Sequence, residues 1–258
     1  MSEANREEAE RQFSFTRRDF QKIRDLIYTR AGITLADNKR DMVYNRIVKR
    51  VRLFGLKDFS SYLAMLETDA DQAEWEHFTN ALTTNLTAFF REPHHFEHLA
   101  EQLRQARGQA VYRIWCSASS TGEEAWSIAM VADEVGAQGP RRVEIIASDI
   151  DTHVLQTAAQ GVYSLDRIEG LSNTRRQRYF LKGQGPNEGL CRVRPKLRER
   201  VSFCQANLLA PRWPVEAPLD AVFCRNVMIY FDKASQRDLV RRFGALIRPE
   251  GYLYVGHS

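Results

Sequence analysis

The stretch Tyr112–Met130 reads YRIWCSASSTGEEAWSIAM, and Asp149 follows nineteen residues later within IIASDID. The apolar run that ends at Cys116 predicts a β-strand, and the six small residues after it predict a tight turn. Apolar residues at helical spacing then predict a helix that begins at about residue 122. A second apolar run ends at Asp149. The order strand, turn, helix, strand and acid is typical of the start of a doubly wound α/β sheet.

This arrangement predicts a site for a nucleotide-like cofactor. In doubly wound sheets the ligand lies beyond the carboxyl end of the first strand, and an acid that ends the second strand binds ribose hydroxyls, a role that suits Asp149. The turn lacks the G-x-G-x-x-G pattern that lets a backbone close on a pyrophosphate. Serine and alanine stand there instead, which favours S-adenosylmethionine over NAD because it carries a ribose but no phosphate. Taken alone, the turn also fits an ordinary βα connection followed by a solvated aspartate.

The composition indicates a globular protein with one large domain, or a small domain and a medium one. The chain has 258 residues, of which 43% are hydrophobic and 27% charged, so it can bury a substantial core. Because it has no long apolar run and no signal-peptide pattern, we expect no membrane insertion and a cytoplasmic location. Four widely spaced cysteines are expected to be reduced thiols in or near the core: Cys116, Cys191, Cys204 and Cys224.

The net charge of +4 is unevenly distributed. Residues 14–57 carry a net charge of +8 and residues 175–200 carry +7, whereas the rest of the chain sums to −11. Two basic segments on an acidic body predict an acidic partner attracted at long range, although solvated helical faces would give the same pattern.

One basic helix is expected over residues 38–54. Val43, Ile47 and Val51 recur at the spacing of a buried helical face. Basic side chains cover much of the remaining surface: Arg46, Lys49, Arg50 and Arg52.

The predicted organisation has four parts. We expect a disordered tail over residues 1–13, a helical domain over 14–82, a linker loop and helix over 83–107, and an α/β domain over 108–258. The strands of the α/β domain are expected at 112–116, 143–148, 201–205, 220–224 and 251–256, with helices at 122–136, 151–160 and 233–247. Clustered Gly and Pro and two β-like stretches predict a small β-subdomain inserted at about 178–203.

Two further segments contain residues suited to a binding site. NLTAFFREPHHF (Asn85–Phe96) places Arg91 beside aromatic residues, where a partly desolvated guanidinium can hold a carboxylate strongly. FCRNVMIYFD (Phe223–Asp232) follows the fourth expected strand, so its polar side chains should project near the cofactor crevice. The nearby histidines His94, His95 and His98 lack the H-E-x-x-H pattern, and we expect no metal site.

Together these segments resemble a known family. NALTTNLTAFFREPHHF, WCSASSTGEEAWSIAM, SDID, QANLL and FCRNVMIYFD occur in the order and spacing of the chemotaxis receptor methyltransferases of the CheR type, which methylate glutamate side chains on bacterial chemoreceptors. The resemblance extends from about Phe15 onward. It implies a Rossmann-like S-adenosylmethionine-dependent methyltransferase sheet in an α/β fold, with an all-helical N-terminal domain and an inserted small antiparallel β-subdomain.

The resemblance also implies a set of site residues. The cofactor, whose demethylated product is S-adenosylhomocysteine, would be lined by Asn85, Thr87, Arg91, Glu123, Asp149, Asn207, Leu208, Arg225 and Asn226. Arg91 and Tyr230 would act as the catalytic residues that flank the transferred methyl group.

The partners implied are methyl-accepting chemoreceptors. Their acidic methylation helices would dock on the basic helix through Arg46, Lys49 and Arg50, and a receptor C-terminal peptide could add to the edge of the β-subdomain. A monomer that binds no nucleic acid is expected. Two alternatives stay open, a nucleic-acid methyltransferase and a receptor-binding adaptor without activity. The first would bind with a steep dependence on salt, but CRNVMIY differs from the Asn/Asp-Pro-Pro-aromatic pattern of amino-nitrogen methylation.

The chain stops at GYLYVGHS, inside or just after the fifth expected strand. The fold of the resembling family continues into a further pair of strands. If Ser258 were the true end, unpaired strand edges and exposed apolar surface would reduce the stability of the isolated chain.

Overall fold

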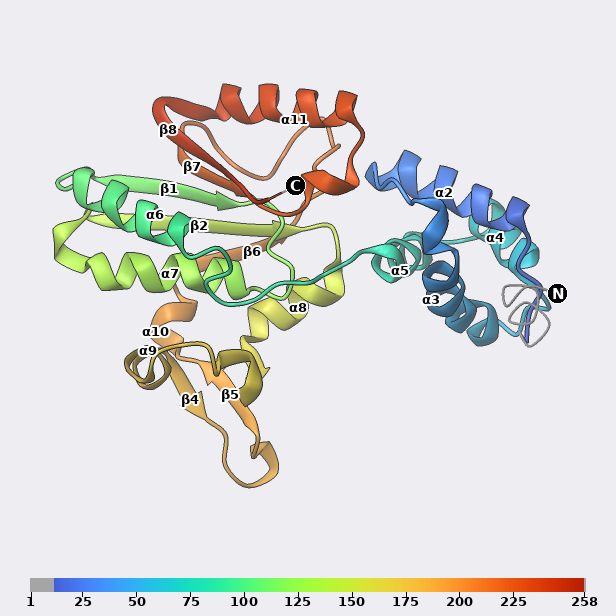
Figure 1. Cartoon of the computed structure of the whole chain (residues 1–258), viewed down its shortest axis with the longest axis horizontal. Coiled ribbons are helices and arrows are strands. Elements are labelled where there is room, and N and C mark those ends of the chain that lie inside the picture. Colours follow the sequence, from blue (N-terminus) through green and yellow to red (C-terminus); the bar gives the residue numbers. More distant parts are fainter. Residues whose placement is uncertain (1–11, 258) are drawn as a thin grey trace. The chain divides into compact units, whose positions relative to one another are not determined.

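A computed structural model describes residues 12–257, so most of the tail predicted over residues 1–13 lies outside the described residues. The chain divides into two compact units (Figure 1). The first comprises the residues up to Thr83 together with Tyr230–Asp232, and the second comprises Thr84–Ile229 together with the residues from Lys233 onward.

The first unit is helical, as predicted. Its α-helices among the described residues are α2 (Arg17–Ala31), α3 (Arg40–Leu53), α4 (Phe59–Thr68) and α5 (Gln72–Leu82), with a short 3-10 turn, η1 (Asp37–Lys39), before α3. Helix α2 begins at a capping box, in which the Thr16 side chain accepts from the Asp19 amide and the Asp19 side chain accepts from the Thr16 amide. It ends at Gly32, whose φ of 69° closes the helix in the left-handed conformation.

Helix α3 buries the face that its sequence predicts. Val43, Ile47 and Val51 are 0% exposed. Two basic residues beside this face have partners within the helical unit. Arg46 donates to the carbonyls of Ala81 and Thr83, and Arg50 pairs with the buried Glu74.

The three residues predicted to bind the receptor, Arg46, Lys49 and Arg50, differ in their exposure and in their partners within the helical unit. Arg46 and Arg50 flank the apolar stripe of α3, so their long side chains reach α5 and hold the two helices together. Lys49 is exposed, and so is Arg52 on the same helix. The receptor-binding role of Arg46, Lys49 and Arg50 stays a prediction.

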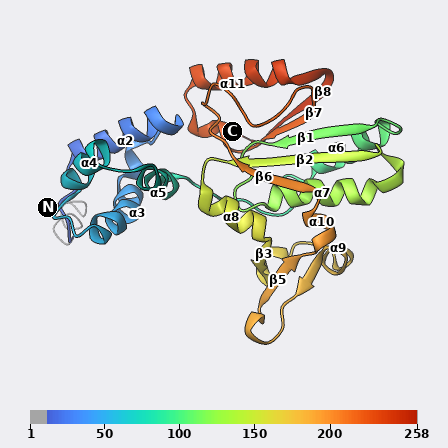
Figure 2. The ribbon, with the colours of Figure 1, turned by 180° about the vertical axis from the view of Figure 1, so that it is seen from behind.

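The second unit contains a parallel sheet in the order β6-β2-β1-β7-β8 (Figures 1 and 2). Its strands are β1 (Val111–Cys116), β2 (Arg142–Asp149), β6 (Val201–Gln205), β7 (Leu219–Cys224) and β8 (Ile247–Val255). The predicted strands are confirmed with small shifts at their ends. The exception is β8, which begins four residues before the predicted position.

Helices cover both faces of this sheet (Figure 1). Ile114 and Cys116 of β1 lie in the core shared with α6 (His94–Gln105) and α7 (Glu123–Val135). Trp115 points to the opposite face, where its ring lies 5.6 Å from that of Phe243 in α11 (Lys233–Leu246). The alternation of side chains along one strand thus assigns α6 and α7 to one face and α11 to the other. The free cysteines lie in or near this core, as expected, and three of the four are buried.

The inserted β-subdomain differs from its predicted span of 178–203. Its antiparallel sheet has the order β3-β5-β4 and includes β3 (Val162–Ser164), which lies outside the predicted span, with β4 (Phe180–Lys182) and β5 (Leu190–Val193). Residues Val201–Phe203 belong instead to β6 of the central sheet. A three-residue strand has too short an alternation to be detected from sequence.

The loop after β4 is a hairpin connection, as predicted. The Gly183 amide donates to the Leu190 carbonyl at 2.8 Å, which joins the two strands.

Among the described residues, no helix is both long enough and apolar enough to cross a bilayer.

Helix α8 (Thr152–Gln160) packs against the end of the small-residue turn at Gly122. Gly122 has φ 98°, and a Cβ there would lie 2.8 Å from the Cβ of Ala158. We expect Gly122→Ala to lower the free energy of unfolding by about 2 to 4 kcal/mol, through backbone strain and overpacking. Urea denaturation followed by circular dichroism measures the change.

Gly108→Ala is the matched control, because Gly108 has φ 89° but a Cβ added there would meet no heavy atom within 4 Å. It shares the strain and lacks the clash, so it should lower the free energy of unfolding by only about 1 kcal/mol. Equal losses in the two variants would show that the contact with Ala158 contributes nothing.

Candidate functional site at the carboxyl edge of the sheet

The strand order reverses at β1. The chain builds β2 and β6 on one side of β1, then β7 and β8 on the other. In open α/β sheets such a reversal leaves a crevice beyond the carboxyl ends of the strands, where ligands bind. Four non-glycine residues of the described chain have positive φ: Phe90, Glu92, Ser120 and Asn226. All four lie in the segment before α6 or in the turns that follow β1 and β7, and such strain is concentrated at functional sites.

The small-residue turn after β1 is fixed to both neighbouring strands. The amide and hydroxyl of Ser117 donate to the carbonyl of Phe223 in β7, at 2.9 and 3.0 Å. The amide of Ser119 donates to the carbonyl of Ser148 in β2, at 2.8 Å. These hydrogen bonds join the turn to β7 on one side and to β2 on the other.

Asp149 ends β2 as a buried acid supported by backbone amides. Its Oδ2 accepts from the Ser120 amide at 2.8 Å and its Oδ1 from the Asp151 amide at 3.0 Å. The side chain makes no ion pair with the described residues, and burial raises the pKa of Asp149 to about 6. Each carboxylate oxygen has a second lone pair, so two further hydroxyl donors can be accepted.

Asn85 from the linker joins this group. Its carbonyl accepts from the Ser120 hydroxyl at 3.0 Å, and its side-chain amide donates to Asp151 at 2.8 Å. The structure thus brings together Asn85, Ser120 and Asp149, of which the first and the last were predicted as site residues from the sequence.

Glu123 begins α7 and is 0% exposed. It accepts from the Thr121 hydroxyl at 2.6 Å and pairs with Arg167. Arg167 also donates to the carbonyl of Thr87 at 3.1 Å, so it links two predicted site residues. Sequence reasoning missed Arg167, which lies in the short 3-10 turn η3 (Leu165–Ile168) outside the quoted motifs.

Arg225 follows β7 and is the centre of a buried ion-pair cluster. Its guanidinium lies 2.7 Å from Glu124 and 3.3 Å from Glu92, and it also donates to the carbonyl of Arg91. Asn226 donates to Glu92 at 3.1 Å. Burial alone would raise the pKa of Glu92, but hydrogen bonds from Asn226 and His257 and the charge of Arg225 outweigh it and lower the pKa to about 2. The cluster therefore fixes the backbone at residues 91–92.

Arg91 is half-buried and is available to a ligand. Its guanidinium donates to the carbonyl of Leu86 at 2.9 Å and makes no ion pair with the described residues.

Tyr230 belongs to the helical unit, where its carbonyl accepts from the Thr34 amide at 2.8 Å. The predicted pairing of Tyr230 with Arg91 at the reacting centre stays a prediction.

Asn207 and Leu208 follow β6, beside Asp149. The amide of the preceding Ala206 donates to the Asp149 carbonyl at 2.9 Å, and Asn207 accepts from the Leu209 amide at 2.9 Å. Leu208 is buried. It can therefore supply an apolar wall at the same edge of the sheet.

The residues present fit S-adenosylmethionine and not a pyrophosphate cofactor. The turn over 117–122 contains no Lys or Arg, and two acids, Glu123 and Glu124, occupy the first helical turn where a phosphate would need positive charge. Both acids are already paired with arginines, Glu123 with Arg167 and Glu124 with Arg225, so the turn offers a phosphate no free positive charge, while Asp149 suits ribose hydroxyls. The hydroxyl of Ser119 is buried without a hydrogen-bond partner among the described residues, so the turn retains an unused polar atom.

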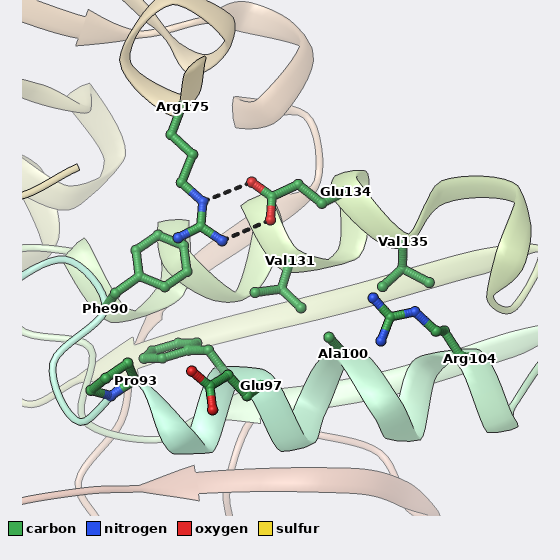
Figure 3. Close-up of a pocket in the computed structure, with 10 residues that line it drawn as sticks. Phe90, Pro93, Glu97, Ala100, Arg104, Val131, Glu134, Val135 and Arg175 are labelled. Carbon is green, nitrogen blue, oxygen red and sulfur yellow. Dashed lines mark hydrogen bonds and ion pairs between the residues drawn. The ribbon is translucent and has the colours of Figure 1, made fainter. Parts of the chain in front are cut away.

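A separate cavity of about 360 Å³ lies between α6 and α7 (Figure 3). Apolar side chains such as Val131 and Ala100 line it, and Arg175 forms a bidentate pair with Glu134 at its edge. None of the residues predicted for the cofactor site lines this cavity.

Comparison with known proteins identifies close relatives of the whole chain. Residues 85–258 match the family model described as CheR methyltransferase, SAM binding domain, and residues 18–83 match CheR methyltransferase, all-alpha domain. The chain is 55% identical to the chemotaxis protein methyltransferase of Salmonella typhimurium over 93% of this chain and 82% of that protein. The Escherichia coli protein of the same name is 52% identical, over 93% of this chain and 83% of that one. Chemotaxis protein methyltransferase 2 of Pseudomonas aeruginosa is 49% identical, over 96% and 88%.

Proposed function

Because the chain belongs to the CheR methyltransferase family, we propose that it transfers the methyl group of S-adenosylmethionine to glutamate side chains of bacterial chemoreceptors. S-Adenosylmethionine is the cofactor of this family's binding domain. The observation that carries the proposal is the buried Asp149, held by two backbone amides beside a turn without phosphate-binding features.

The cofactor supplies an electrophilic methyl group on a positively charged sulfur. Asp149 would accept hydrogen bonds from the ribose hydroxyls, and Glu123 would lie toward the cationic part of the ligand. A glutamate substrate is ionised at pH 7, so the protein needs no general base to activate it. Its main tasks are to align the carboxylate with the methyl group and to exclude water.

Arg91 is the proposed orienting residue. The Arg225 cluster fixes its backbone, while its guanidinium makes no ion pair with the described residues. A planar guanidinium holds a carboxylate in a defined orientation. Contact through one oxygen would leave the other free to attack, so Arg91 would position the nucleophile without neutralising it completely.

The exposed cations of α3, Lys49 and Arg52, are the proposed receptor-facing residues. Acidic methylation helices would be attracted to them at long range. We further propose that the protein acts as a monomer and that the antiparallel sheet of the β-subdomain receives an extended receptor peptide along one of its edges.

The test is transfer of radiolabelled methyl from S-adenosylmethionine to membranes that contain chemoreceptors. The label should be released as methanol by base, because base hydrolyses methyl esters but does not release methyl groups from the bases of a nucleic acid. Label found in RNA would favour a nucleic-acid methyltransferase, and absence of any transfer by the intact protein would favour an adaptor.

Replacing Arg91 by Ala should lower kcat/KM for the receptor by about tenfold to a hundredfold, because the carboxylate loses its alignment. Arg142→Ala is the control, since Arg142 is exposed at the opposite end of β2. Cofactor binding by each variant, measured by calorimetry, separates a positioning defect from a binding defect. Equal rates for the two variants would remove Arg91 from the reaction.

A further inference from the structure

Three potential metal ligands lie together just before α6 and in its first turn. Glu92, His94 and His95 each offer one donor atom, and these atoms all lie within 4.8 Å of one another. One carboxylate and two imidazoles form a ligand set typical of Zn²⁺. The sequence predicts no metal here, because His94, His95 and His98 lack the H-E-x-x-H pattern.

Glu92 has φ 57°, so the chain turns there and α6 starts only at His94. Its carboxylate lies beside the ring of His95, with Oε2 3.5 Å from His95 Nδ1.

Two of the donor atoms, Glu92 Oε2 and His95 Nδ1, are buried and make no hydrogen bond with the described residues. Glu92 Oε2 does lie 3.3 Å from a guanidinium nitrogen of Arg225, so it is ion-paired on one side only. Donors about 2.0 to 2.1 Å from a tetrahedral zinc ion lie about 3.3 Å apart. The observed 3.5 Å between these atoms is therefore close to one edge of a zinc coordination tetrahedron.

A fourth group approaches from the end of β8. His257 Nδ1 lies 3.3 Å from Glu92 Oε1, and its ring lies 6.1 Å from that of His94. His257 is 81% exposed, so its ring can rotate toward a bound ion. A solvent molecule would serve equally well as the fourth ligand.

The local charge also favours a cation. Arg225 lies between Glu92 and Glu124, at 3.3 and 2.7 Å from their oxygens. One positive and two negative groups leave a net charge of −1 beside the imidazoles. A divalent ion would meet a carboxylate that Arg225 neutralises only in part.

We propose that Glu92, His94 and His95 bind a divalent transition-metal ion of the Zn²⁺ type. The ion occupies a site distinct from the ribose-binding carboxylate of Asp149. It is connected to the methyl-transfer site through Glu92, which also accepts from Asn226. A bound ion thus fixes the segment that carries Arg91.

The test is a titration of tag-free, metal-stripped protein with Zn²⁺ in competition with a chromophoric chelator. One equivalent should bind. His94→Gln should weaken binding by at least about tenfold, and His94→Gln/His95→Gln by at least about a hundredfold. Co²⁺ should bind at the same site and give the intense visible absorption of a tetrahedral complex.

His153→Gln is the matched control, because His153 is an exposed histidine at the start of α8, on a different part of the same unit. It should leave the Zn²⁺ affinity unchanged. Because His94 is exposed, its single variant should fold normally, which circular dichroism checks. Absence of Zn²⁺ binding by the unaltered protein, or equal affinities for His94→Gln and His153→Gln, would overturn the proposal.

Discussion

Arg225→Met should lower the free energy of unfolding by about 3 to 5 kcal/mol. The Arg225 side chain is 1% exposed and is shared by two carboxylates that are themselves 11% and 12% exposed, those of Glu124 and Glu92. Methionine fills a similar volume but leaves both acids buried without a cation. It also removes the donor to the Arg91 carbonyl. Chemical denaturation at neutral pH measures the loss.

A second substitution distinguishes uncompensated charge from lost packing. Glu124→Gln added to Arg225→Met removes one of the stranded charges, so it should restore part of the stability. The loss in Arg225→Met should also be smaller near pH 5 than near pH 8, because burial already raises the pKa of Glu124 and protonation would remove its charge. A loss that is independent of pH and unaffected by Glu124→Gln would assign the role of Arg225 to packing against Phe96, whose ring centroid lies 5.4 Å away.

Long apolar patterns made most of the fold predictable. The strand before Cys116, the helix after Gly122 and the strand that ends at Asp149 each contain enough residues for their periodicity to be read. Strand β3 could not be predicted, because Val162–Ser164 has three residues and is stabilised by pairing with β5, which is distant in sequence. Arg50 and Lys49 could not be distinguished for the same reason. Arg50 pairs with Glu74 of α5, whereas Lys49 is exposed, and the sequence does not show which of two cations has a partner.

In the candidate site, too, residues placed by their own strand could be predicted, whereas residues placed by contacts distant in sequence could not. Asp149 was predictable because the end of an apolar strand gives its position in the sheet. Arg167 was not, because it reaches Glu123 from a turn in the inserted segment. The ion pair of Glu92 with Arg225 was not predictable either, because it joins residues that are distant in sequence. Side chains placed by strand ends could be predicted, whereas those placed by the insertion or by contacts distant in sequence required the three-dimensional structure.

Asp149→Asn should weaken S-adenosylmethionine binding by about a hundredfold to a thousandfold. The carboxylate can accept two hydroxyl hydrogen bonds, each worth about 1.5 to 3 kcal/mol when the acceptor is charged. Asparagine keeps the shape but has one acceptor oxygen. Its amide nitrogen would also face the amide of Ser120 or Asp151, both of which donate to Asp149 in the structure. Isothermal titration calorimetry with the cofactor measures the affinity, and Ser164→Ala, at an exposed position in the β-subdomain, is the control.

The pH dependence tests the charge itself. Burial raises the pKa of Asp149 to about 6, above its ordinary value of 3.8. The folded state therefore retains the proton more tightly than the unfolded state, and the stability that this gives is complete below the ordinary pKa and is lost as pH rises through about 6. Cofactor affinity should change in the opposite direction, since the ionised carboxylate binds the ribose. It should rise from about pH 5 to about pH 7 and then level off, while Asp149→Asn should lose this rise. An equal rise in the variant would mean that another group titrates and that Asp149 does not bind the cofactor as an anion.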